Sequence, residues 1–367
     1  MDGECLIYFI YYMWFHEQDI LLHNIIDVNN IHGYVLPHAS TKYTGKIISH
    51  TLQFKPSKMF KHIYILYYPS QKDPNINGKY YHEFYVPFKS LKYVIKKYWK
   101  IHDVEFIGVN VSLLNNIKII PNSLVVVSAD FSHRLPLQKA IKLENKAAHA
   151  LMFRYLDSPF MKVVDDVRTF ELLYKIIPEN WGLQWIGRTR SPGVKGVGYL
   201  SFFIKSNSVK RIPDGIFITA YDSKMNSREC LGEWFSHSKL YSKTIENELK
   251  NKVIKLGEKD SRLTGGRNIH LPIKYYSVTY LYREKHNLKI IRGWHGIKYN
   301  AFYLPNVLLE HTFDNGQWIK NTDIKWFQKD EFDVSDTLSK LNEKSGIYDK
   351  NSNIELYYSN YVCHKYT

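Results

Sequence analysis

Two histidines follow short apolar segments of the chain. His38 comes directly after Tyr34–Pro37, and His133 comes shortly after Ser123–Ser128. Asp130 lies between the second segment and His133. Imidazole and carboxylate groups at strand ends are able to hold a metal ion, but two histidines without a third good donor predict weak binding. The alternative is that both histidines are hydrogen-bonded within a cleft that holds no ion.

A cysteine and a histidine in the second half of the chain define a second candidate site. Cys230 stands in an apolar-flanked segment, and His295 lies between Gly293 and Gly296. A neighbouring imidazolium lowers the pKa of a thiol from its usual value of about 8.5, so this pair would suffice for a nucleophilic transferase or hydrolase. The alternative is a buried, inert thiol beside glycines that only shape a turn.

The elements that must position the first pair alternate between strands and helices. Apolar runs predict buried strands, and apolar residues at helical spacing predict helices. The predicted strands are Tyr34–Pro37, His62–Tyr67, Phe106–Val111 and Ser123–Ser128, and the predicted helices are Thr44–Gln53, Leu91–Trp99 and Leu137–Leu156. This pattern predicts an α/β domain over residues 1–205, which closes near Lys205 after the glycine-rich stretch Gly187–Gly198.

The pattern changes to tyrosine-rich strands after Ile212, which predicts an α+β domain over residues 206–367. The short linker Lys205–Lys210 separates the two domains. The predicted strands are Ile216–Tyr221, Tyr275–Tyr282, Trp294–Ile297 and Ile354–Tyr358; the predicted helices are Lys243–Lys255 and Val334–Lys340, the latter capped by Ser335 or Asp333.

The chain is basic, with 50 Lys+Arg against 35 Asp+Glu and a net charge of +15. Nucleic acid is therefore a candidate partner, but on net charge alone. Five lysines lie on one side of the predicted helix Leu91–Trp99 and its flanks; they are Lys89, Lys92, Lys96, Lys97 and Lys100. This pattern is typical of a solvated helix face, and the alternative is a binding surface.

Three cysteines, Cys5, Cys230 and Cys363, match no disulfide framework, which favours a reducing compartment. The apolar run Leu6–Phe15 is too short to span a bilayer and lacks the basic flank of a signal peptide. We therefore expect a cytoplasmic or nuclear protein that does not bind membranes. No nucleotide-binding loop, HExxH or GxSxG motif occurs.

Three segments of the first half resemble the Memo family, whose fold is related to that of the class III extradiol dioxygenases. They are Val35-Leu36-Pro37-His38-Ala39, His62–Leu66 followed by Pro69-Ser70-Gln71, and Leu124–His133. The resemblance implies a metal site with two histidines and one cysteine. His38 matches the first ligand, whereas Gln71 and Ile186 stand at the other two positions. His133 and Asp130 match a further family motif. We therefore expect a degenerate metal site at His38 and His133, with Gln71 and Asp130 in the cleft, and little or no bound iron, copper or zinc.

The second half, from near Asn207, is similar to the AMMECR-type domain. The segments that carry the similarity are Gly215–Ala220, Arg228–Trp234, Asp260–Leu263, Tyr276–Leu281, Gly293–Ile297 and Tyr303–Val307. The similarity places Cys230, His295 and Arg228 at positions of the family's motifs. Memo and AMMECR-type proteins occur together, beside a radical-SAM protein, in AmmeMemoRadiSam systems.

These observations together indicate a Memo–AMMECR fusion protein that binds a small-molecule ligand or a protein partner. Arg228 is expected in the binding cleft of the second domain. Two enzyme hypotheses remain as alternatives: a metal-dependent oxidoreductase at His38 and His133, and a transferase or hydrolase that uses Cys230 and His295.

Overall fold

The chain folds into two compact units in a computed structural model. The structure describes residues 24–68, 81–111, 117–192, 195–207, 211–260, 271–284, 290–310, 313–314, 317–318, 334–347 and 353–366. Among these residues, the first unit comprises the chain up to Ala147 together with Leu156–Ser206. The second unit comprises Ala148–Tyr155 and the chain from Asn207 onward. The expectations for Gln71 and for the cap at Asp333 lie outside the described residues.

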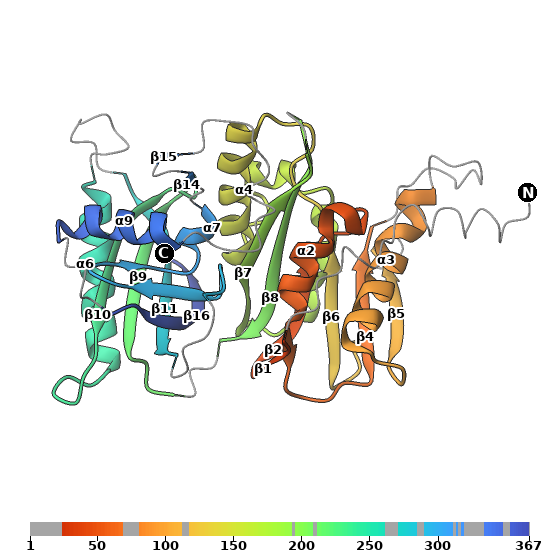
Figure 1. Cartoon of the computed structure of the whole chain (residues 1–367), viewed down its shortest axis with the longest axis horizontal. Helices are drawn as coiled ribbons and strands as arrows, with labels where there is room; N and C mark the ends of the chain where they lie inside the picture. The colour runs from red at the N-terminus through yellow and green to blue at the C-terminus, as the bar shows by residue number, and fades with distance from the viewer. Residues whose placement is uncertain are drawn as a thin grey trace, which may run out of the picture. The chain divides into compact units, whose positions relative to one another are not determined.

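The first unit contains a six-stranded sheet with the order β5-β4-β6-β2-β8-β7 (Figure 1). Strands β2, β6, β4 and β5 are parallel, and β8 is antiparallel to both of its neighbours, β2 and β7. The strands are β2 (Ile31–Leu36), β4 (His62–Tyr67), β5 (Glu105–Asn110), β6 (Ser123–Ser128), β7 (Trp181–Arg190) and β8 (Gly198–Ser206). The short strands β1 (Ile26–Val28) and β3 (Phe54–Pro56) form a separate parallel pair.

Helices cover both faces of this sheet, as the buried apolar strands require. They are α2 (Thr41–Leu52), α3 (Tyr81–Trp99), α4 (Leu137–Met152), the 3-10 helix η2 (Pro159–Val163) and α5 (Val167–Ile176). Gly187 on β7 faces Ile47 of α2, whereas Arg188 beside it donates to Glu144 of α4. Because neighbouring strand residues point to opposite faces, α2 and α4 lie on opposite sides of the sheet.

Most elements of the first unit follow the sequence pattern. Strands β4 and β6 have the predicted bounds, and β2, β5, α2, α3 and α4 match their predictions with shifted ends. Strands β7 and β8 are not apparent from the sequence pattern, because arginines and glycines within these strands hide their burial. Arg188 and Arg190 on β7 are 5% and 3% exposed, and a buried carboxylate, described below, pairs with both.

The second unit is built on an antiparallel sheet of six strands with the order β10-β9-β11-β16-β12-β13. Its strands are β9 (Gly215–Asp222), β10 (Ser227–Trp234), β11 (Ile273–Arg283), β12 (His295–Lys298), β13 (Phe302–Tyr303) and β16 (Glu355–Lys365), with a separate pair β14 (Phe313–Asp314) and β15 (Gln317–Trp318). Its helices are α6 (Lys243–Glu258), α7 (Val307–Glu310) and α9 (Val334–Ser345).

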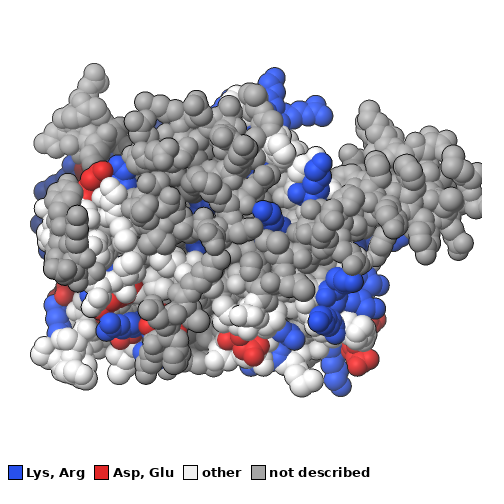
Figure 2. Space-filling view, viewed as in Figure 1, with Lys and Arg blue, Asp and Glu red and all other residues white. Residues whose placement is uncertain are grey.

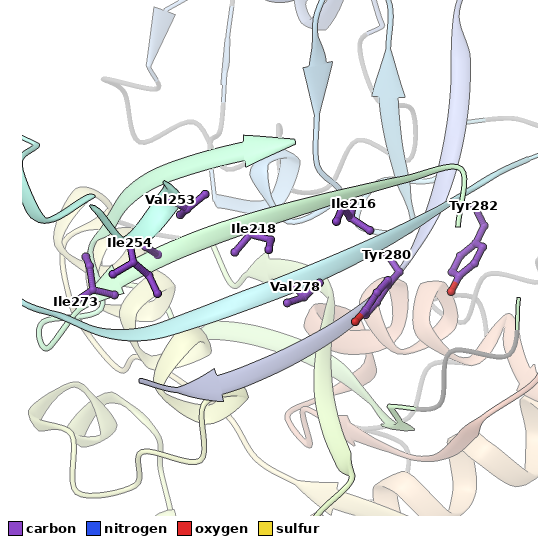
Figure 3. Packing of buried hydrophobic residues seen from close by; sticks show 9 residues of the cluster. Ile216, Ile218, Val253, Ile254, Ile273, Val278, Tyr280 and Tyr282 are labelled. Atoms are coloured by element: carbon purple, nitrogen blue, oxygen red, sulfur yellow. The ribbon is translucent and has the colours of Figure 1, made fainter. Parts of the chain in front are cut away.

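Helix α6 packs on one face of the second sheet (Figure 3). Val253 and Ile254 of α6 contact Ile216, Ile218 and Val278 of the strands. The side chain of Ser242 accepts a hydrogen bond from the N–H of Ile245, so it fixes the start of the helix. The remaining strand side chains therefore point to the opposite face.

The second sheet is strongly curved around this opposite face. Phe302 belongs to the edge strand β13, yet its ring lies 5.1 Å from that of Trp234 on the other edge strand, β10. A flat sheet of six strands would separate the two edges by roughly 24 Å. Phe302, Leu281 and Tyr357 form an apolar core inside the curve. No helix in the described parts of the chain has the length and apolar character needed to cross a membrane.

Candidate functional site

The connections of the first sheet create a crevice between β2 and β6. After β2 the chain enters α2 on one face, and after β6 it enters α4 on the other face. Neighbouring parallel strands whose connections diverge in this way leave an opening at their carboxyl ends, where open α/β sheets bind ligands. His38 lies two residues beyond β2, and Asp130 lies two residues beyond β6.

Hydrogen bonds fix the position of His38 in this crevice. Its backbone N–H donates to Oδ1 of Asp130 at 2.9 Å, and its Nδ1 lies 3.0 Å from the hydroxyl of Ser128 at the end of β6. The other ring nitrogen, Nε2, therefore faces the carboxylates. It lies 3.9 Å from Oδ2 of Asp130 and 3.5 Å from Oδ2 of Asp165. A ligand histidine is typically oriented through its second nitrogen in the same way.

Asp165 supplies the third donor, which the sequence analysis did not find. It lies between η2 and α5, and its backbone N–H donates to the carbonyl of Asp130 at 3.2 Å. The protein atoms around its carboxyl and the negative charge of Asp130 raise the pKa of Asp165 to about 7, against the opposing effect of His38, even though the residue as a whole is exposed. Two carboxyl groups therefore share one small space beside an imidazole.

The three side chains have the spacing of a metal site. One donor atom from each of His38, Asp130 and Asp165 lies within 4.8 Å of the others. An ion with bonds of about 2.0–2.2 Å to nitrogen and oxygen separates neighbouring ligand atoms by roughly 2.9–3.5 Å. Nε2 of His38 lies 3.9 Å and 3.5 Å from the two carboxylate oxygens, close to that spacing. The expectation of a site without a third good donor is therefore corrected.

His133 lies near this cluster but is not one of its three members. Its pKa is lowered, first by desolvation and also by the positive charge of His38, while Asp130 opposes the shift. The residue is exposed and pairs with Val197 through an isolated bridge. His133 is thus a neutral imidazole at the rim of the crevice, and Asp165 is the residue that lies closest to Nε2 of His38 together with Asp130.

A buried ion network supports the loop that carries Asp130 and His133. Glu144 of α4 accepts hydrogen bonds from Arg188 at 2.6 Å and from the hydroxyl of Ser132. Arg190 donates to the same hydroxyl at 3.1 Å and to the carbonyl of Leu135 at 2.5 Å. Because all these groups are buried, each charge needs its partner, and the loop between β6 and α4 is held rigidly.

The ligand set that the Memo resemblance implies does not fit the described residues. Ile186, at the position of the cysteine, is fully buried in β7 and offers only its carbonyl, which lies 3.2 Å from Nε2 of His50. Gln71 is outside the described residues. Only His38 remains from that set, and the other two donors of the cluster are carboxylates.

Cys230 and His295 are not brought together in the second unit. Strands β10 and β12 are separated by β9, β11 and β16. On β10, Cys230 has the same orientation as Trp234, which points into the curve. On β12, Gly296 faces the inner residue Phe302, so the neighbouring His295 points outward. The prediction that these two residues meet is corrected, because the register places their side chains on opposite faces.

Neither side chain has the surroundings of an activated pair. The hydroxyl of Thr219 donates to Sγ of Cys230 at 3.1 Å, and the protein atoms around the sulfur raise the thiol pKa even though the residue as a whole is exposed. His295 is buried and accepts the N–H of Ile291 on Nδ1 at 2.9 Å. Burial lowers the pKa of His295 to about 4, so the ring is neutral and supports the turn before β12.

Arg228 is a structural residue and does not line a cleft. It is fully buried, and its guanidinium donates to the carbonyls of Gly257 at 3.3 Å and Asp260 at 2.6 Å. Gly257 lies in the last turn of α6 and Asp260 lies two residues beyond the helix, where carbonyls lack partners inside it. Arg228 therefore joins β10 to the carboxyl end of α6.

Comparison of the chain with protein-family models and with curated protein sequences finds no match.

Proposed function

We propose that the first unit binds a divalent metal ion through His38, Asp130 and Asp165 and uses this site to hold a small ligand. The observation that carries the proposal is the convergence of three donor atoms within 4.8 Å at the crevice between β2 and β6. The relation to the Memo and AMMECR families remains part of this proposal. This relation is supported by the position of three motif residues at the crevice, which are His38, Asp130 and His133.

The donor chemistry indicates which ions the site would select. One imidazole and two carboxylates suit zinc, manganese and ferrous iron, whereas soft copper(I) prefers the sulfur ligands that this cluster lacks. The bound ion would polarise an oxygen atom of the ligand. Asp130 and Asp165 would neutralise the ion, and Ser128 would keep Nε2 of His38 directed at it.

Residues next to the cluster suit a ligand with an anionic group. Arg168 lies in the first turn of α5, three residues after Asp165, and its side chain is 47% exposed. The guanidinium stacks on the ring of Tyr68 at 3.6 Å and is held by Asp166 at 2.9 Å. A guanidinium fixed in this way presents its free edge to carboxylate or phosphate groups.

A second candidate function is metal-dependent catalysis, and the position of His133 favours it. This imidazole stays neutral near pH 7 and lies at the rim of the same crevice, where it is able to accept a proton from a bound ligand or water. Replacing His133 by Gln would then abolish turnover but leave metal binding intact, which separates the enzyme from a binding protein.

Titration calorimetry of protein stripped with a chelator tests the proposal. We expect one zinc or manganese ion per chain. We expect Asp165→Asn and His38→Ala each to weaken binding by more than about 10–100-fold, the loss typical of removing a residue that only orients a metal ligand. The controls are Asp103→Asn and His62→Ala, which alter the same residue types elsewhere in the first unit. Unchanged binding in Asp165→Asn, or equal losses in the controls, would refute the site.

A further inference from the structure

The exposed residues of α2 and of the described part of α3 are all lysines. On α2 the only exposed residues are Lys42 and Lys46. Among the described side chains of α3, from Pro87 onward, the exposed residues are again all lysines, and Lys100 follows directly after the helix; they are Lys89, Lys92, Lys96 and Lys97. We refer to these seven lysines as the basic face.

The basic face is a single surface because the two helices are neighbours on one side of the first sheet. The indole N–H of Trp99, at the end of α3, donates to the carbonyl of Leu52, at the end of α2, at 2.8 Å. Leu91, Val94 and Ile95 on the inner side of α3 are buried. Figure 2 shows basic side chains gathered over the lower part of α3.

Helices α5 and α6 have mixed exposed surfaces, and α4 exposes only Lys139 and Lys142 beside Gln138, so the general basicity of the chain does not explain a face of seven lysines. The exposed residues of α5 are Arg168, Glu171 and Lys175. Helix α6 exposes Glu248 together with its lysines. A solvated helix typically carries both signs of charge, whereas the basic face exposes one sign only.

We infer that the basic face binds the phosphate backbone of a nucleic acid. The lysines of α3 run from Lys89 to Lys97, or roughly 12 Å of helix, and DNA carries about one phosphate charge per 1.7 Å of its axis. A membrane surface fits less well, because interfacial helices insert apolar side chains, and the apolar side of α3 is buried in the first unit. Base edges are not read by lysines spaced in this way, so binding is independent of sequence.

Fluorescence anisotropy with a labelled 20-base-pair DNA duplex tests the inference on the full chain. We expect micromolar binding at low salt, with a slope of log K against log salt of about −4.5 to −6 if five to seven lysines meet phosphates. Replacing Lys89, Lys92 and Lys96 by Glu should weaken binding at least tenfold and reduce the slope by about 2.7.

The matched control replaces Lys252 and Lys255 of α6, together with Lys259 directly after the helix, by Glu. These exposed lysines have the same sequence spacing, and each triple variant lowers the formal net charge of +15 by six, to +9. We expect a change of less than threefold in this control. Thermal unfolding verifies that both variants fold. If the α3 triple variant does not fold, a version with Lys→Gln at the same three positions replaces it. Equal loss in the control, no binding at low salt, or binding to phosphatidylserine vesicles in place of DNA would each overturn the inference.

Discussion

Substitution of Gly198 by Ala tests the coupling between the buried ion network and the crevice. A methyl group at Gly198 would lie 1.9 Å from Oε1 of Glu144 and 2.9 Å from the hydroxyl of Ser132. The carboxylate must therefore move by roughly 1.5 Å to reach an ordinary contact. That movement breaks its 2.6 Å hydrogen bond to Arg188 inside the protein.

The cost is set by the buried charges. Breaking a buried ion pair costs about 3–5 kcal/mol, because the separated charges stay out of water. For a unit of this size each 1 kcal/mol lowers Tm by about 2–4 °C, so we expect a loss of at least about 6 °C. Gly198 also exchanges backbone hydrogen bonds with Phe131 and Ser132, so metal affinity should fall with stability.

Thermal unfolding of a double-mutant cycle with Glu144→Ala isolates the contact. If the clash with Glu144 is the cause, Gly198→Ala should cost little in the Glu144→Ala background, and the coupling energy should approach the whole cost of the single change. Gly108→Ala on β5 is the control, since its added methyl group meets only the ring of Phe88 at 3.2 Å. Additive effects, or a loss no larger than that of Gly108→Ala, would refute the reasoning.

Three further outcomes follow from the described contacts. The pKa of Asp165 is about 7 in the metal-free folded protein and near 4 in the unfolded chain, so between these pH values the folded protein binds the extra proton. The free energy of unfolding should therefore fall as pH rises from about 4 to 7. In urea unfolding, Asp165→Asn should be more stable than the wild type at pH 8 and should lose this advantage near pH 4. Because the thiol pKa of Cys230 is raised, this residue should alkylate at pH 8 more slowly in the folded than in the unfolded protein. His295→Ala should leave the alkylation rate unchanged. A slower reaction in that variant would indicate that Cys230 and His295 form a functional pair. Arg228→Ala should destabilise the second unit by roughly 2–4 kcal/mol, because the carbonyl of Asp260 loses its guanidinium donor and the buried side chain leaves a cavity. An effect below about 1 kcal/mol in urea unfolding would contradict that role.

The sequence predicted the local elements well and the convergence of side chains only in part. Apolar runs place β4 and β6 with their observed bounds, and they put His38 and Asp130 at strand ends. Asp165 could not be found in this way, because it follows no strand and reaches the crevice only through the path of η2 and α5.

The candidate pair in the second unit shows the same limit more strongly. The sequence places Cys230 and His295 on strands, but strand order and the face of each side chain depend on register, which a single sequence does not fix. Strands β7 and β8 were missed for a related reason. Arg188 and Arg190 suggest solvent exposure until Glu144, supplied by α4, is seen to neutralise them inside the protein.

Pulsed electron paramagnetic resonance of the manganese-loaded protein tests the central claim most directly, because it detects nitrogen atoms bound to the ion. The account predicts one histidine nitrogen coupling, which is lost in His38→Ala and retained in His133→Ala, since His133 is not among the three convergent donors. A nitrogen coupling that persists without His38, or that disappears without His133, would contradict the assignment of the site to His38, Asp130 and Asp165.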